Sequence, residues 1–157
     1  MAATTTPTVR TYEAEISIRE NDAAAVISIV KSLSASWAKG DADTLSRLYA
    51  EDATVALPGD TYLRGRRAIR DWMARAFEGK WRGTRVLGQP LEIKYVNDDI
   101  IVMFSQGGAY RPGETEVSAD DAIRGMWVFA RQGPGWTISA YENTPVRATI
   151  PLSGVGG

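Results

Sequence analysis

The sequence predicts an α+β fold in which helices from the first half of the chain lie on one face of a curved antiparallel sheet built by the second half. Apolar residues in the first half recur at three- and four-residue spacing, which is the period of an amphipathic helix. After Gly83 they alternate with polar residues, which is typical of half-buried strands. The 157 residues fit one domain, and helices that precede strands favour a layered α+β arrangement.

The two ends of the chain are predicted to lie outside this domain. Residues 1–8 are small and polar, which indicates a disordered tail. Residues 11–18 alternate apolar and polar side chains, which predicts a strand-like arm ordered against a sheet edge or a partner protomer. We therefore divide the chain into a tail and arm at 1–20, one domain at 21–147 and a frayed C-terminal tail at 148–157.

Three helices are predicted before the long strands. The first is capped by Asn21 or Asp22 and ends at Gly40, since glycine readily adopts the left-handed conformation that terminates helices. The second is short and is capped by Asp41 or Asp43. The apolar stripes of the first and third helices consist of Val26, Ile27, Val30, Leu33 and Trp37, and of Ile69, Trp72, Met73, Ala76 and Phe77.

The strands are predicted to form hairpins. Residues 54–57 and 61–63 flank a Pro-Gly-Asp turn at residues 58–60, where proline and glycine each favour the reversal. Gly88 and Pro90 predict a bulge or bend in the next strand. The longer strands are expected at residues 84–96, 100–110, 123–131 and 135–144.

The composition restricts the chemistry that the chain can perform. Lys and Arg number 18 against 19 Asp and Glu, so no net basic field would attract nucleic acid. There is no long apolar run and no start that resembles a signal peptide, so we expect a cytoplasmic protein without a membrane partner. Cysteine and histidine are absent, which excludes thiolate catalysis, disulfides and every histidine mechanism. Acid–base chemistry would depend on carboxylates, tyrosine, lysine or water. The sequence contains no glycine-rich nucleotide-binding loop, so it does not indicate a nucleotide cofactor.

The last predicted strand carries the first candidate for catalysis, Glu142. Trp136, Ile138 and Ala140 form an apolar row at every second position, and Glu142 continues that row on the face predicted to be buried. A carboxylate that faces an apolar pocket could work as a general acid or base near neutral pH. The alternative is an ion pair with an arginine such as Arg124, because an isolated charge is costly to bury.

Further candidates are placed around the same pocket. Asp60 could supply a second catalytic carboxylate, although Pro-Gly-Asp is also an ordinary turn sequence. Arg124 could stabilise an enolate if it faces inward, but both faces of its strand are apolar and the pattern leaves its direction open. The aromatic residues are each typical of a core, yet as a group they suit a flat, apolar ligand. The predicted ligand contacts are Trp37, Tyr49, Tyr62, Trp72, Phe77, Phe104, Arg124, Trp127 and Asn143.

Several short segments, in this order, give the chain a resemblance to a known superfamily. They are residues 37–43 with Leu48 and Tyr49, residues 52–55, residues 63–69, residues 135–138, and the pair Asn143 and Thr144. No single segment is diagnostic, but their order and spacing extend over residues 22–146. The chain resembles the nuclear transport factor 2-like superfamily, which includes ketosteroid isomerase, limonene epoxide hydrolase and the SnoaL-like polyketide cyclases. Within it, the chain is most similar to the SgcJ/EcaC-type proteins of polyketide and enediyne biosynthesis.

The resemblance implies a cone-shaped, cystatin-like α+β barrel with a pocket between the helices and the concave side of the sheet. It also implies a homodimer, which we expect to form through the outward face of the sheet. From the residues themselves we expect a hydrophobic small-molecule ligand and neither a cofactor nor a metal. Relatives often carry His or Gln just before the Asn143 and Thr144 pair, where this chain has Glu142.

Three functions are compatible with these residues. The first is cofactor-free cyclisation, isomerisation or dehydration of a polyketide-derived intermediate in antibiotic biosynthesis. The second is binding of such a molecule, or of a partner enzyme, without chemistry, which the absence of histidine favours. The third is opening of an epoxide by carboxylate-activated water, for which no spacing in the sequence specifies the carboxylates.

Overall fold

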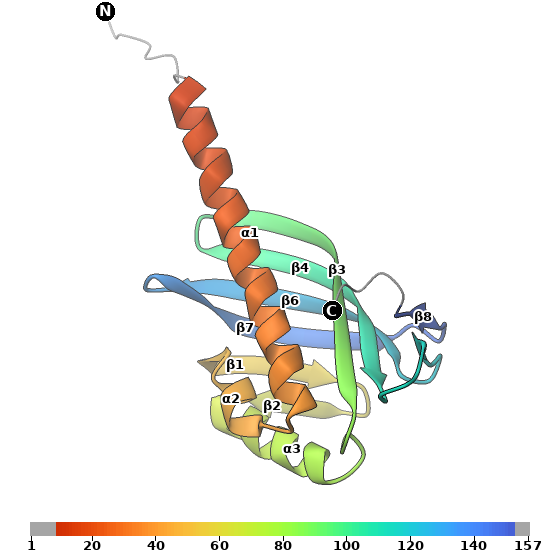
Figure 1. Cartoon of the computed structure of the whole chain (residues 1–157). Helices are drawn as coiled ribbons and strands as arrows, with labels where there is room; N and C mark the ends of the chain where they lie inside the picture. The colour runs from red at the N-terminus through yellow and green to blue at the C-terminus, as the bar shows by residue number, and fades with distance from the viewer. Residues whose placement is uncertain (1–8, 153–157) are drawn as a thin grey trace, which may run out of the picture.

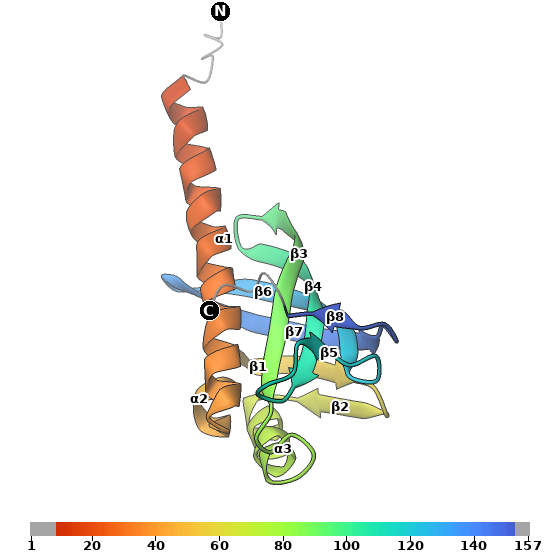
Figure 2. The same ribbon diagram turned by 45° about the vertical axis from the view of Figure 1, so that its right-hand side comes forward.

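A six-stranded curved sheet with one long helix across its face dominates the computed structural model, which describes residues 9–152. Figures 1 and 2 show the long helix on one side of the sheet and the two shorter helices grouped near its C-terminal end. The predicted α+β fold is confirmed. The elements are α1 (Val9–Ala38), α2 (Ala42–Ser46), β1 (Tyr49–Leu57), β2 (Thr61–Arg64), α3 (Arg66–Glu78), β3 (Arg85–Asn97), β4 (Ile100–Tyr110), β5 (Glu116–Val117), β6 (Ala122–Gln132), β7 (Gly135–Pro145) and β8 (Ile150–Pro151).

The strand order of the main sheet is β2-β1-β7-β6-β4-β3. All neighbours are antiparallel except β1 and β7, which run parallel, so the sheet is mixed and not wholly antiparallel as predicted. The predicted β1–β2 hairpin is confirmed. The predicted irregularity near Pro90 is also confirmed, because the β3–β4 register shifts between Pro90 and Glu92.

The N-terminal part of α1 replaces the predicted strand-like arm. Residues 11–18 lie within one continuous helix, so the prediction of a strand packed against a sheet edge is wrong. Glu13, Ala14 and Glu15 in this segment favour helix, and a helix satisfies its backbone hydrogen bonds internally without a sheet edge. Figure 1 shows these first turns projecting past the sheet. The tail predicted at residues 1–8 lies outside the described residues, and the domain limits stay a prediction.

A glycine cap separates α1 from α2. Gly40 has a φ of +63°, and its N–H donates to the carbonyl of Trp37 at 2.9 Å. The N–H of Asp41 donates to the carbonyl of Ser36 at 3.0 Å, which completes a Schellman motif. Asp41 then caps α2 by accepting the N–H of Thr44 at 3.0 Å. The predicted end of the first helix at Gly40 is therefore confirmed.

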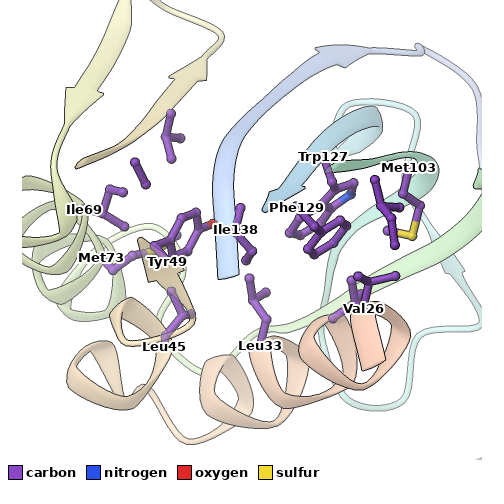
Figure 3. Close-up of a cluster of buried hydrophobic side chains, with 14 of the residues drawn as sticks. Val26, Leu33, Leu45, Tyr49, Ile69, Met73, Met103, Trp127, Phe129 and Ile138 are labelled. Atoms are coloured by element: carbon purple, nitrogen blue, oxygen red, sulfur yellow. The ribbon is translucent and has the colours of Figure 1, made fainter. Parts of the chain in front are cut away.

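The hydrophobic core lies between α1 and the sheet and extends towards α2 and α3. Figure 3 shows Val26 and Leu33 of α1 near Phe129 and Ile138 of the sheet. Phe129 and Ile138 are fully buried. A second group around Tyr49 joins β1 to the short helices, and its members are Leu45, Tyr49, Ile69 and Met73.

A second, smaller core holds the C-terminal segment. Ile150 of β8 pairs with Val117 of β5, and both side chains are buried together with Leu87 and Ala122. The prediction of a frayed tail from residue 148 is therefore wrong for Ile150 and Pro151. A two-residue strand gives no periodicity in the sequence, so this pairing had no local signal.

Candidate functional site

A cavity of about 350 Å³ opens between α1, α3 and the inward face of the sheet. Helix α1 contributes Ser34 and Trp37, and α3 contributes Trp72. The inward residues of β4, β6 and β7 form the facing wall, and Asp120 and Asp121 lie on the lining just before β6. Most of the lining is apolar, so the cavity suits a ligand that is itself mainly apolar.

Indole rings form much of the cavity wall, and two of them, Trp37 and Trp127, donate their N–H groups to the protein. Trp37 Nε1 donates to Thr84 Oγ1 at 2.9 Å, and Trp127 Nε1 donates to Ser105 Oγ at 2.8 Å. Trp127 also packs on Tyr141 with a centroid separation of 4.3 Å. These contacts fix the rings, which can then offer apolar faces to a flat ligand.

The polar end of the cavity is built by Tyr141 and Asn143 on β7. Asn143 Nδ2 donates to Tyr141 Oη at 3.1 Å, and Asn143 Oδ1 is buried without a partner among the described residues. Burial raises the pKa of Tyr141 to about 12, against the lowering effect of the Asn143 hydrogen bond. Burial, with a smaller contribution from Tyr141, also raises the pKa of Tyr49, whose side chain lines the same cavity. Both tyrosines therefore stay neutral hydrogen-bonding groups at physiological pH.

The absence of a side chain at Gly125 makes room for this polar end. A Cβ atom at Gly125 would lie 3.0 Å from Ser105 Oγ, 3.0 Å from Tyr141 Cε2 and 3.2 Å from Tyr141 Oη. Gly125 is also the cross-strand partner of Asn143. The glycine lets the Tyr141 ring lie directly against β6.

A β-bulge in β7 reverses the predicted orientation of Glu142. Val128 pairs with Ala140 and Phe129 pairs with Ile138, so Ser139 is an extra residue between the two pairs. An extra residue turns every following side chain to the other face of the sheet. Consequently Tyr141, Asn143 and Pro145 line the cavity.

Glu142 is therefore exposed and does not line the cavity. The predicted position of Glu142 inside the pocket is wrong. The alternative ion pair is wrong too, because neither Glu142 nor Arg124 belongs to an ion pair within residues 9–152.

Four other predicted site residues lie away from the cavity. Arg124 and Phe104 alternate with inward residues of β6 and β4 and point to the outward face. Tyr62 lies on the edge strand β2 and is 63% exposed. Asp60 is an exposed turn residue with a φ of +58°, so it serves the reversal between β1 and β2. The predicted places of Phe104, Tyr62 and Asp60 at the pocket are wrong, because the alternation of their strands or their turn directs them outward. The direction of Arg124, which the sequence pattern leaves open, is outward.

Phe77 occupies an intermediate position. Its ring meets the Trp37 ring edge-on with a centroid separation of 5.2 Å, but Phe77 does not line the cavity.

The structure brings together five predicted residues on the cavity, which are Trp37, Tyr49, Trp72, Trp127 and Asn143. Sequence reasoning missed Tyr141, Ser105 and Asp121. Simple alternation along the last strand places Tyr141 opposite the row of Ile138 and Ala140, and the bulge that turns it inward leaves no mark in the residue pattern.

Membrane-spanning helices and metal-binding clusters are both absent from residues 9–152. No helix there is long and apolar enough to cross a membrane. No group of three or more His, Cys, Asp or Glu side chains in that range could hold a metal ion.

A helix-covered curved sheet with an apolar cavity on its inward face defines the nuclear transport factor 2-like, cystatin-like class. The chain belongs to the SnoaL-like domain family, which matches residues 30–137. No curated protein matches the sequence. The match does not distinguish the SgcJ/EcaC-type group within the superfamily, so that assignment stays a prediction.

Solved structures share the fold at low sequence identity. An NTF2-like protein with a cystatin-like fold from Novosphingobium aromaticivorans is 22% identical, with coverage of 96% of this chain and 94% of that chain and a TM-score of 0.71. The hexachlorocyclohexane dehydrochlorinase LinA-type3 from Novosphingobium barchaimii is 16% identical, with coverage of 89% and 96% and a TM-score of 0.70. A candidate scytalone dehydratase from Novosphingobium aromaticivorans is 17% identical, with coverage of 90% and 99% and a TM-score of 0.66.

Proposed function

We propose that the chain binds a flat, largely apolar small molecule in this cavity, of the kind formed in polyketide biosynthesis. The observation that carries the proposal is the cavity of about 350 Å³ walled by Trp37, Trp72 and Trp127, with Tyr141 and Asn143 at one end. Aromatic walls favour a planar ligand, and a few polar groups on an apolar wall fix its orientation.

A cavity-filling substitution tests this proposal. Ser34→Phe adds a ring on the α1 side of the cavity, whereas Ser32→Phe adds the same ring at an exposed position of the same helix. Binding of 1-naphthol, followed by quenching of tryptophan fluorescence and by calorimetry, should be lost in Ser34→Phe and kept in Ser32→Phe. Thermal melting confirms that both variants are folded. Equal binding by both variants, or no binding by the unmodified chain, would overturn the proposal.

The second candidate function is cofactor-free acid–base catalysis, such as cyclisation, isomerisation or elimination. It is favoured by Asp121, a half-buried carboxylate on the cavity lining that accepts from Ser118 Oγ at 3.1 Å. Two structures that share the fold carry the names of a dehydrochlorinase and of a candidate dehydratase, and both names denote elimination reactions. In this proposal Asp121 removes a proton from carbon, and Tyr141 donates a hydrogen bond to the enolate oxygen that forms.

Isotope exchange tests the catalytic proposal without knowledge of the product. The chain should accelerate exchange of the α-protons of 1-tetralone in deuterated buffer, as followed by NMR. Asp121→Asn should return the rate to that of buffer, and Asp52→Asn, at an exposed position of β1 that does not line the cavity, should keep it. If the unmodified chain exchanges the α-protons no faster than buffer alone does, the catalytic proposal is wrong and the binding proposal is unaffected.

A further inference from the structure

One polar atom on the cavity wall has no hydrogen-bond partner. Asn143 Oδ1 is buried and unpaired within residues 9–152, on a residue that lines the cavity. Buried side-chain oxygens in folded proteins nearly always accept a hydrogen bond, and leaving one unpaired costs free energy. The wall therefore has a free acceptor, which a donor group of a bound ligand would satisfy.

The neighbouring tyrosine adds a free donor to this acceptor. Tyr141 Oη accepts the Nδ2–H of Asn143 at 3.1 Å, so the proton of Tyr141 is not used in that bond. The hydroxyl keeps this proton at neutral pH, because burial raises the pKa of Tyr141 to about 12. Asn143 and Tyr141 together therefore present one acceptor and one donor on the same strand.

We infer that the polar end of the ligand is a phenol or enol hydroxyl that donates to Asn143 Oδ1 and accepts from the Tyr141 hydroxyl. This inference rests on the proposed function and specifies its ligand. A ketone, an ether or an ester can only accept, so each would leave Asn143 Oδ1 unpaired. Of a ketone and its enol tautomer, the site would bind the enol more tightly.

A matched pair of probes tests the inference. 1-Naphthol and 1-methoxynaphthalene share the same ring system, but only the first has an O–H donor. In calorimetric titrations the unmodified chain should bind 1-naphthol about tenfold more tightly than its methyl ether. Asn143→Leu should reduce this ratio to about one by weakening 1-naphthol alone, and Asn21→Leu, at an exposed position of α1, should leave it unchanged.

The outcomes separate the inference from the proposed function. If both probes bind equally to the unmodified chain, or if the ratio survives in Asn143→Leu, the inference is wrong and the ligand site stands. If neither probe binds, both the site and the inference fall. If Asn143→Leu does not fold, Asn143→Ser takes its place. The unmodified chain should still prefer 1-naphthol to its methyl ether, and Asn143→Ser should lose this preference.

Discussion

Arg131 Nη2 lies 2.9 Å from Asp22 Oδ2, and this ion pair joins α1 to the β6–β7 hairpin. Trp136 Nε1 donates to the other carboxylate oxygen of Asp22 at 3.2 Å, and the Arg131 guanidinium lies 4.4 Å from the Trp136 ring centroid. The Asp22 side chain is 16% exposed and that of Arg131 30%, so water screens the pair only in part. The contact fixes α1 across the sheet and so helps to define one wall of the cavity.

Removal of this contact should destabilise the fold. Asp22→Ala removes the acceptor of the Trp136 N–H and one acceptor of the Arg131 guanidinium, which keeps the carbonyl of Asp98, at an expected cost of about 1–3 kcal/mol in the free energy of unfolding. Urea unfolding measures the change. The control is Asp71→Ala, since the Arg70–Asp71 pair is 47% and 43% exposed and should contribute less than about 1 kcal/mol. Equal losses in the two variants would contradict the role of Asp22.

Gly107 of β4 should tolerate no side chain. A Cβ atom there would lie 1.8 Å from the carbonyl oxygen of Leu87, which belongs to the backbone of β3 and cannot rotate away. Gly107→Ala is therefore expected to lower the free energy of unfolding by more than about 3 kcal/mol, or to prevent folding. Gly135→Ala, where the nearest atom is 4.0 Å away, should change it by less than about 0.5 kcal/mol. A stable Gly107→Ala variant with an unchanged melting temperature would argue against this strand packing.

Alkaline pH should weaken the fold through the buried tyrosines. The pKa of Tyr141 is about 12 in the folded chain and about 10 in the unfolded chain, so between these values the folded state holds more protons. Stability is then complete below about pH 10 and falls as the pH rises towards 12. Urea midpoints at pH 9 and pH 11 should differ less for Tyr141→Phe than for the unmodified chain. The same difference in both proteins would show that Tyr141 does not contribute.

The outward face of the sheet should form the interface of a homodimer. Several apolar residues of this face are only half-buried in the single chain, namely Val102, Phe104, Met126, Val128 and Ala140. We propose that a second copy covers them, because an apolar sheet face of this kind gains free energy when it leaves water. Sedimentation should give a dimer for the unmodified chain and a monomer for Val128→Lys. A monomeric unmodified chain at high concentration would refute this.

Local patterns predicted most of the secondary structure. The spacing of Val26, Val30 and Leu33 marks the buried face of α1, and Gly40 marks its end because the left-handed turn there favours glycine. The alternation after Gly83 predicted the long strands. These features depend on neighbouring residues alone, which is why the sequence reveals them.

The arrangement of the site depends on contacts between distant segments. The extra residue at Ser139 is defined only by the pairing of β7 with β6, and it changes which of Tyr141 and Glu142 faces inward. The parallel pairing of β1 with β7 is likewise invisible in either strand alone. Apolar and polar residues alternate in the sequence of residues 11–18, yet this segment belongs to a helix that begins at Val9.

The bulge directs Tyr141 into the ligand cavity and Glu142 to the outward face. Calorimetric titration of 1-naphthol into Tyr141→Phe and Glu142→Gln tests this arrangement directly, since the two residues are adjacent and both substitutions preserve size. We expect Tyr141→Phe to bind about five- to tenfold more weakly, because one hydrogen bond is lost, and Glu142→Gln to bind like the unmodified chain. Weakened binding in Glu142→Gln with unchanged binding in Tyr141→Phe would contradict these orientations of the two side chains.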